Sequence, residues 1–254
     1  MDKQAKIYVA GHNGLAGSAI VRKLTIEGYN NLLLKTSKEL DLRDKTAVYN
    51  FFEEEKPEYV FFAAGTVGGI MANKTYPADF IFDNVAMIFN TVDAAYKSKV
   101  KKLLYLGSSC IYPKMASQPI KEEYLLTGPL EETNKPYALA KIAGIELCAS
   151  YNKQYGTNYI ALMPTNLFGL KDNYDLNNSH LVAALIRKFY EAKLNNKPFV
   201  ELWGTGNPRR EILSSDQLAD ACLHFMNTYN ENEIINIGKG EDYAINEIAA
   251  IIKE

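Results

Sequence analysis

The chain has 254 residues and a formal net charge of −2 at pH 7, with 28 Lys and Arg against 30 Asp and Glu. This balance gives no general attraction to nucleic acid or to an anionic membrane surface, and so it excludes proteins that bind through a strongly basic face. The hydrophobic fraction, 47%, is enough for one large core or for one domain that carries a smaller lobe.

Sorting signals and metal-binding patterns are not evident in the sequence. Residues 1–6 are polar and lead directly into a strand-like segment, without the apolar core of a signal peptide. No apolar run approaches the roughly 20 residues that span a bilayer. The three cysteines and three histidines are widely spaced, which argues against a disulfide framework and against a metal site. We therefore predict a cytoplasmic protein without a metal ion.

A glycine-rich loop follows the first predicted strand, residues 6–10, and precedes a predicted helix over residues 18–27. Its Gly-x-x-Gly-x-x-Gly spacing lets the backbone approach a pyrophosphate and points the helix N-terminus at the phosphates. The same spacing also occurs in ordinary tight turns, but its place between a strand and a helix favours nucleotide binding. The predicted cofactor contacts of this loop are Gly11, His12, Asn13, Gly14, Leu15, Ala16 and Gly17.

The second predicted strand, residues 32–34, ends where an NAD-binding chain usually has an acidic residue for the ribose 2′-hydroxyl. Here Lys35, Ser37 and Lys38 supply cations and a hydroxyl instead, which suits a 2′-phosphate and favours NADP over NAD. Surface lysines are common, so the same residues are also compatible with a plain solvated turn. Asp41 is expected at the adenine end of the cofactor, ahead of a helix over residues 45–55.

Strands and helices continue to alternate up to residue 163. The predicted elements are a strand over residues 59–65, a flexible loop over 68–73, a helix over 77–98, a strand over 102–106, a helix over 137–155 and a strand over 159–163. This order predicts an α/β fold with a right-handed, doubly wound parallel sheet of the Rossmann type. Cofactor and substrate should meet at the C-terminal ends of its strands.

The pattern changes after residue 166. A polar loop (171–178), a helix (179–194), a turn-rich link (203–211), one more strand (234–238) and a last helix (243–253) follow. We predict a cofactor domain over residues 1–166, to which residues 211–240 return. Residues 167–210 and 241–254 are predicted to form a smaller, interleaved substrate lobe.

Three side chains predict carbonyl chemistry near the end of the strand over 102–106. Tyr137 and Lys141 are four residues apart and so share one helix face, where the ammonium can lower the phenol's pKa from its usual value of about 10. Ser108 adds a second hydroxyl, so a carbonyl oxygen could lie between two donors while hydride arrives at its carbon. A lone Tyr-x-x-x-Lys is often a coincidence on a solvated helix, and it is the order of the whole chain that favours catalysis.

With these residues in place, the chain resembles the extended short-chain dehydrogenase/reductase family over nearly its whole length. The segments that carry the resemblance are residues 10–20, 67–73, 75–81, 107–114 and 178–180. A sugar-nucleotide dehydratase of that family would have Ser-Thr-Asp-Glu where this chain has Ser-Ser-Cys-Ile at residues 108–111. The resemblance implies an NADP(H)-dependent enzyme that epimerises GDP-4-keto-6-deoxy-D-mannose at C3 and C5 and reduces it at C4 to GDP-L-fucose. It also implies a homodimer, formed through the helices around residues 80–98 and 137–155.

The resemblance further implies residue roles. Cys110 would be the base and His180 the acid of the epimerisation, while Tyr137 would supply the proton at C4. Without the resemblance, Cys110 is also compatible with a small core residue and His180 with a helix-capping residue. Lys188, Trp203 and Arg210 match positions that hold the GDP part of the substrate, although each could equally be a surface or packing residue. The predicted cofactor contacts also include Leu106, Gly107, Lys141, Pro164, Asn166, Leu167 and His180.

Two departures from the family keep alternatives open. The family commonly has a basic residue where Asn13 stands, and its members continue for several tens of residues beyond Glu254, so the predicted lobe is short. One alternative is an enzyme acting on another GDP-4-keto sugar, such as a 6-deoxyheptose, and another is a catalytically silent NADP-binding protein. The presence of both Cys110 and His180 argues against a reductase without epimerase activity.

Overall fold

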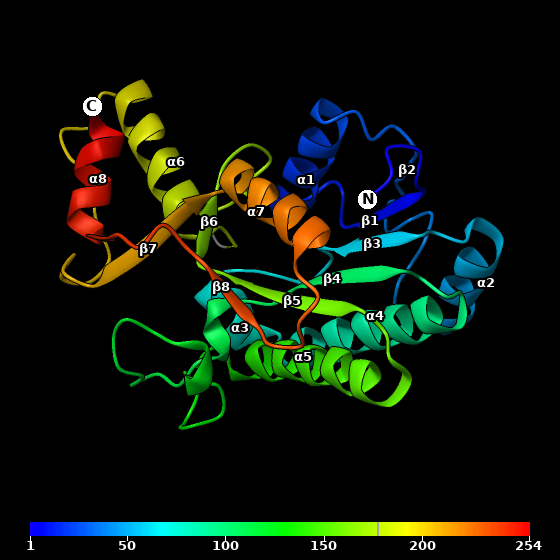
Figure 1. The fold of residues 1–254 in the computed structure, drawn as a ribbon. Helices are drawn as coiled ribbons and strands as arrows, with labels where there is room; N and C mark the ends of the chain where they lie inside the picture. Colours follow the sequence, from blue (N-terminus) through cyan, green and yellow to red (C-terminus); the bar gives the residue numbers. More distant parts are fainter. Residues whose placement is uncertain (177) are drawn as a thin grey trace.

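The computed structural model describes residues 1–176 and 178–254, and its centre is a six-stranded parallel sheet (Figure 1). The strand order is β2-β1-β3-β4-β5-β8, so the chain runs outward from β1 in one direction and then in the other. The strands are β1 (Ile7–Ala10), β2 (Leu32–Leu33), β3 (Tyr59–Phe62), β4 (Lys102–Leu106), β5 (Tyr159–Pro164) and β8 (Ile235–Ile237). The predicted doubly wound α/β fold is confirmed.

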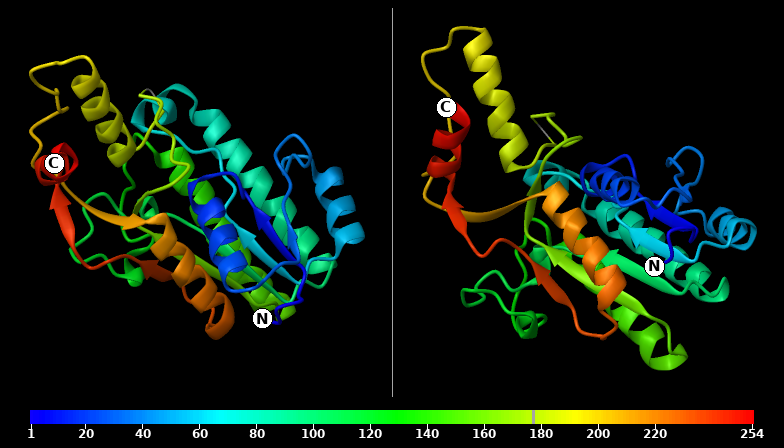
Figure 2. Two further views of the ribbon diagram at one scale, coloured as in Figure 1. Left: turned by 90° about the horizontal axis from the view of Figure 1, so that it is seen from above. Right: turned by 45° about the horizontal axis from the view of Figure 1, so that its top comes forward.

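Each face of the sheet is covered by helices because every central strand is apolar on both sides. In β1, Ile7 and Val9 belong to one core cluster, whereas Tyr8 and Ala10 belong to another, as the alternation of side chains along a strand requires. The first face packs on α1 (Leu15–Ile26) and α7 (Ser215–Thr228), and the second on α2 (Lys45–Glu55), α4 (Pro77–Lys97) and α5 (Lys135–Tyr155). Seen from above, α1 and α7 lie in front of the sheet (Figure 2).

The helices follow local signals in the sequence, although some start earlier than predicted. α1 begins at Leu15 rather than at residue 18, because Gly14 itself is the N-cap. Pro77 and Pro136 lie in the first turns of α4 and α5, where a missing N–H breaks no helical hydrogen bond. α5 ends at Gly156, whose φ of 68° is the left-handed conformation that suits glycine.

A second, three-stranded sheet lies beside the first and was not predicted. It contains β6 (Asn166–Phe168), β7 (Arg209–Ser214) and β9 (Asp242–Ala244) in the order β6-β7-β9. Two of these strands have only three residues, which is too short for an alternating pattern to be recognised. Part of the predicted flexible loop over 68–73 is likewise a short helix, α3 (Ile70–Thr75).

The helices α6 (Leu181–Leu194) and α8 (Ile245–Lys253) lie side by side, away from the main sheet (Figure 1). A small cluster of buried side chains, Val182, Leu185 and Ile248, joins them. The division of the chain into a cofactor domain and a substrate lobe stays a prediction. Within the described residues, no helix has the length and apolar character needed to cross a membrane.

Candidate active site

A cavity of about 790 Å³ opens at the C-terminal ends of the parallel strands. Its wall takes residues from the segments that follow β1, β2, β3, β4 and β5, which is where a doubly wound sheet is expected to bind its ligands. Most of the predicted cofactor contacts and most of the predicted catalytic residues line this one cavity. Those in the wall are Gly11, His12, Asn13, Gly14, Leu15, Ala16, Lys35, Ser37, Asp41, Leu106, Gly107, Ser108, Tyr137, Lys141, Pro164, Asn166, Leu167 and His180.

The glycine loop is packed too tightly to accept side chains at two of its positions. Gly11 has a φ of 79°, and a Cβ atom there would lie 2.7 Å from the carbonyl oxygen of Ala63. A Cβ atom on Gly17 would lie 2.1 Å from the carbonyl oxygen of Gly11. Gly17 therefore lies behind the loop rather than in the cavity wall, and its role is to let helix α1 approach the loop. The N-terminus of α1 consequently points into the cavity.

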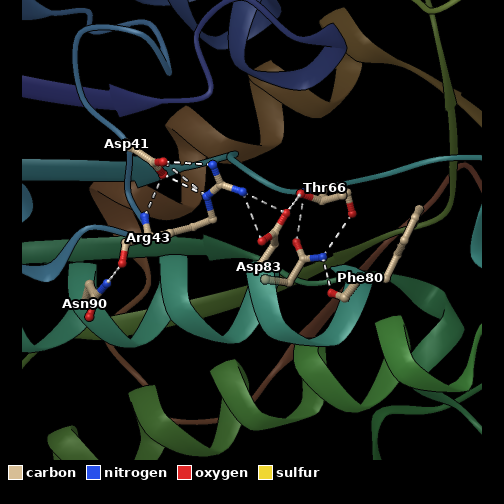
Figure 3. Close-up of polar contacts among 7 residues, drawn as sticks. Asp41, Arg43, Thr66, Phe80, Asp83 and Asn90 are labelled. Atoms are coloured by element: carbon tan, nitrogen blue, oxygen red, sulfur yellow. Dashed lines mark hydrogen bonds and ion pairs between the residues drawn. The ribbon is translucent and has the colours of Figure 1, made fainter. Parts of the chain in front are cut away.

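The part of the cavity wall that follows β2 was predicted to bind the adenosine half of the cofactor. Lys35 and Ser37 line it after β2, whereas Lys38 is exposed and lies outside the wall. Arg43 donates to both carboxylate oxygens of Asp41, with a shortest distance of 2.8 Å, and these bonds hold the pKa of Asp41 below its usual value. Arg43 also reaches Asp83 on α4 at 3.2 Å (Figure 3).

Tyr137 and Lys141 lie on one face of α5, as their spacing predicts. The Nζ atom of Lys141 lies 5.6 Å from the centre of the Tyr137 ring and donates a hydrogen bond of 2.7 Å to the carbonyl oxygen of Leu106. The ring of Phe80 on α4 packs edge-on against Tyr137 at 6.3 Å between ring centres. The phenol is thus held between α4 and the end of β4.

Burial dominates the proton affinities of this pair. It raises the pKa of Tyr137 and lowers the pKa of Lys141 to about 8. The expected lowering of the phenol's pKa by the ammonium is therefore not found, because removing the phenolate from water outweighs the attraction of the neighbouring cation. The phenol stays protonated at neutral pH, which is the state that a proton donor requires.

The Ser108 side chain lies where β4 turns into a short 3₁₀ helix (Ser109–Ile111), and it accepts a hydrogen bond of 3.4 Å from the backbone N–H of Cys110. Cys110 is half-buried and lies just behind the cavity wall. Burial raises the pKa of its thiol, and Lys141 and Ser108 partly oppose that rise. The positive charge that acts on this thiol is that of Lys141 on α5.

His180 is exposed in the cavity wall and is the N-cap residue of α6. The segment before it is tied to the loop that follows β3, because the backbone N–H of Gly69 donates to the carbonyl oxygen of Asn178 at 3.1 Å. A Cβ atom on Gly69 would lie 2.9 Å from the carbonyl oxygen of Ser179. This close approach places the segment that leads to His180 next to the loop containing Gly69.

The three residues predicted to bind GDP lie outside the cavity wall. Lys188 on α6 lies over the indole ring of Trp203, with its Nζ atom 4.7 Å from the ring centre. Trp203 is 72% exposed. Arg210 on β7 is exposed, and its side chain donates to the backbone carbonyl oxygen of Arg209. The structure thus brings Lys188 and Trp203 together outside the cavity, where the Nζ atom of Lys188 also donates a hydrogen bond of 3.2 Å to the carbonyl oxygen of Glu201.

Several cavity residues were missed in the sequence. Arg43, Asp83, Asn73 and Asp172 line the wall and come from separate elements, and of these only Asn73 lies in a segment that carries the resemblance. Buried polar atoms of His12, Asn73 and Asp172 have no hydrogen-bond partner among the described residues, which suits a wall that holds a polar ligand. Among all the residues that the structure describes, no group of His, Cys, Asp and Glu side chains could hold a metal ion.

Known proteins similar to this chain have the same fold over its whole length. A GDP-L-fucose synthase from Arabidopsis thaliana is 55% identical over 253 residues, which cover 100% of this chain and 78% of that protein. A GDP-L-fucose synthase from Escherichia coli is 50% identical over 261 residues, which cover 99% and 81%. The structure of a GDP-D-glycero-L-gluco-heptose synthase from Campylobacter jejuni, determined in the presence of NADPH, has a TM-score of 0.94 and 42% identity, covering 100% and 86%.

The predicted resemblance is also confirmed at the level of the family. The model of the NAD dependent epimerase/dehydratase family matches residues 7–238, which include the glycine loop, the Tyr137 and Lys141 pair and His180. The protein is accordingly an enzyme of the oxidoreductase and epimerase type that the sequence predicted. The chain belongs to the NAD dependent epimerase/dehydratase family.

Proposed function

We propose that the protein converts GDP-4-keto-6-deoxy-D-mannose to GDP-L-fucose by epimerisation at C3 and C5 and NADPH-dependent reduction at C4. The observation that carries the proposal is the single cavity that combines the glycine loop with Ser108, Tyr137, Lys141 and His180. The identity of 50–55% to GDP-L-fucose synthases supports the same reaction.

The residues present fit NADP(H). The two crowded glycines and the N-terminus of α1 suit a pyrophosphate, and Lys35 with Ser37 suits a 2′-phosphate. The expected cofactor is confirmed by the relatives, because the Campylobacter jejuni structure was determined in the presence of NADPH and a GDP-L-fucose synthetase from Naegleria fowleri is bound to NADP. When bound, the cofactor supplies hydride to C4.

In the reduction, the chain's own residues hold and protonate the carbonyl oxygen. Ser108 and Tyr137 both line the cavity, and the hydroxyl of each can donate to the C4 oxygen. Tyr137 gives its proton as negative charge develops on that oxygen. Lys141, fixed on the carbonyl of Leu106, keeps a positive charge near the phenolate that forms.

In the epimerisation, protons must leave and return on opposite faces of the sugar. We assign the removal of the C3 and C5 protons to the Cys110 thiolate and their return to His180, which belong to different elements, the 3₁₀ helix after β4 and the N-terminus of α6. The 4-keto group makes both protons acidic, and the Ser108 and Tyr137 hydroxyls stabilise the enolate oxygen. Lys188 and Trp203, with Arg210, are the proposed contacts of the GDP part.

A second candidate substrate is a GDP-4-keto heptose. The observation that favours it is the close structural match to the Campylobacter jejuni heptose synthase and to a GDP-mannoheptose C4 reductase from the same organism, each with a TM-score of 0.94. Comparing the rates of NADPH oxidation with the hexose and with the heptose substrate separates the two. A faster reaction with the heptose would replace the fucose assignment.

The proposed reaction is tested with GDP-4-keto-6-deoxymannose and NADPH in deuterated water, followed by the absorbance of NADPH and then by NMR of the product. Deuterium at both C3 and C5 of GDP-fucose is expected. NADPH oxidation without deuterium would show a plain C4 reductase. NADPH binding without turnover of either sugar would show the catalytically silent protein.

We also propose that the protein is a homodimer that uses the outer surfaces of α4 and α5. Phe82 and Phe89 are seven residues apart on one face of α4 and are 70% and 40% exposed. Leu139 on the adjoining α5 is 39% exposed. Large apolar side chains on two helices that pack against each other suit an interface between copies of the chain. A cytoplasmic location stays a prediction of the sequence.

A further inference from the structure

Arg43 spans the adenosine end of the cofactor cavity. It lies directly before Asp44, the N-cap of α2, and lines both the main cavity and a smaller adjoining cavity of about 450 Å³. Its Nε and Nη2 atoms donate to Asp41, and its Nη1 atom donates to both oxygens of Asp83 at 3.2 and 3.3 Å. Figure 3 shows the guanidinium between the two carboxylates, one on each side.

The two carboxylates leave the flat faces of the guanidinium uncovered. A guanidinium is planar, and its N–H donors all point outward in that plane. Asp41 accepts from Nε and Nη2 and Asp83 accepts from Nη1, so most of the in-plane donor directions are occupied and these bonds leave the flat faces uncovered. Nearly half of the Arg43 side chain, 48%, is still exposed. A planar cation whose edges are largely occupied and whose face is uncovered is well suited to stack on an aromatic ring.

Asp83 is itself held firmly, which fixes the orientation of the guanidinium. The hydroxyl of Thr66 donates to Asp83 at 3.1 Å, and the neighbouring Asn84 exchanges hydrogen bonds with the backbone N–H and C=O of Thr66. Asn90, about two turns further along α4, donates to the backbone carbonyls of Leu42 and Arg43 at 3.0 Å each. Helix α4 therefore holds both the side chain and the backbone of Arg43.

We propose that the face of the Arg43 guanidinium binds the adenine ring of NADP(H), with Asp41 and Asp83 as the residues that position it. This inference rests on the proposed binding of the cofactor's adenosine half between the end of β2 and α4. Adenine is the aromatic group of the cofactor at that end, and Leu40 and Leu42 complete an apolar surface beside Arg43 in the same wall. The stacking contact involves the base, so it is separate from recognition of the 2′-phosphate by Lys35 and Ser37.

The test compares Arg43→Lys, which keeps the charge and loses the plane, with Arg43→Ala. Dissociation constants for NADPH, NADH and reduced nicotinamide mononucleotide are measured by titration of dihydronicotinamide fluorescence, which requires no sugar substrate. Both variants are expected to weaken NADPH and NADH by the same factor, roughly 5- to 20-fold. Binding of the mononucleotide, which lacks adenosine, is expected to stay within about twofold of the wild type.

The matched control is Arg22→Lys, which alters another exposed Arg–Asp pair, Arg22 with Asp216, on the outer surface of α1 and α7. It is expected to leave all three constants unchanged. Wild-type NADH affinity in both Arg43 variants would overturn the proposal, and a loss confined to NADPH would assign Arg43 to the 2′-phosphate instead. Equal weakening of the mononucleotide would show a general structural role. A wild-type protein that binds none of the three ligands would overturn the cofactor site itself.

Discussion

Lys141 and Leu106 join two elements of the site through one hydrogen bond of 2.7 Å, from the Nζ atom of the lysine to the backbone carbonyl oxygen of the leucine. The bond ties α5, which carries Tyr137, to the end of β4. Because Lys141 is only 5% exposed, the bond is shielded from water, and the ammonium has a fixed place beneath the phenol. Position, rather than a lowered phenol pKa, is what the lysine supplies in this structure.

This arrangement predicts a pH dependence of the reduction step. Burial lowers the pKa of Lys141 to about 8, so the side chain is charged below that pH and loses its charge above it. Tyr137, whose pKa burial raises, remains a proton donor across the same range. The rate of NADPH oxidation in a single turnover is therefore expected to fall as the pH rises through about 8.

Lys141→Met is the variant that isolates this effect. Without the ammonium, the single-turnover rate is expected to be at least about 100-fold lower and to show no fall near pH 8. A wild-type rate that is constant from pH 7 to pH 9.5 would contradict the assignment of the charge of Lys141 to this step.

Cys110 should control proton exchange and leave cofactor binding untouched. Cys110→Ser is expected to abolish deuterium incorporation at C3 and C5 in deuterated water, because a serine hydroxyl is a far weaker base than a thiolate. Burial raises the pKa of the thiol, so in the wild type the exchange should rise by up to about tenfold per pH unit between pH 7 and 8. NMR of the recovered sugar nucleotide measures the loss of deuterium in the variant and the pH dependence of exchange in the wild type.

Cys148→Ser provides the control, since Cys148 is fully packed in α5 within the main core. That variant is expected to exchange deuterium as the wild type does, once its lower stability has been allowed for. Exchange in Cys110→Ser at the wild-type rate would show that another group removes the protons.

The sequence predicts the main sheet and the glycine loop because both depend on local signals. Continuous apolar strands and a loop that directly precedes a helix can be recognised from neighbouring residues alone. The contact between Arg43 and Asp83 cannot, since the two residues are forty positions apart and meet only when α4 packs across the end of β3. The four-residue spacing of Tyr137 and Lys141 likewise predicts a shared face, but the direction of their pKa shifts depends on burial, which the spacing does not determine.

Gly17 should be required for cofactor binding although it lies behind the cavity wall. In Gly17→Ala, the new Cβ atom would lie 2.1 Å from the carbonyl oxygen of Gly11, so the loop or the helix must move. We expect NADPH to bind at least about tenfold more weakly, because the loop's backbone then no longer fits a pyrophosphate. Fluorescence titration with NADPH measures the change.

Gly28→Ala controls for the loss of stability in that variant. Gly28 also lies in the α1 region, and its φ of 82° strains any other residue, but a Cβ atom there has open space. This variant is expected to lower the melting temperature and to bind NADPH normally. Equal affinity for NADPH in both glycine variants would show that the tight approach of α1 to the loop is not needed for binding.

The exposed apolar side chains of α4 predict that the protein forms a homodimer through this helix. Replacing both Phe82 and Phe89 by Glu places two negative charges on the face proposed to meet a second copy, where burying an unpaired carboxylate is strongly unfavourable. Light scattering after size-exclusion chromatography is expected to show a dimer for the wild type and a monomer of 28.5 kDa for the double variant. Phe199→Glu, at a position that is 77% exposed but outside α4 and α5, is expected to leave the dimer intact.

A wild-type monomer would refute the interface outright. A double variant that remains dimeric would place the contact on another surface, because two buried charges could not be tolerated at the centre of this one.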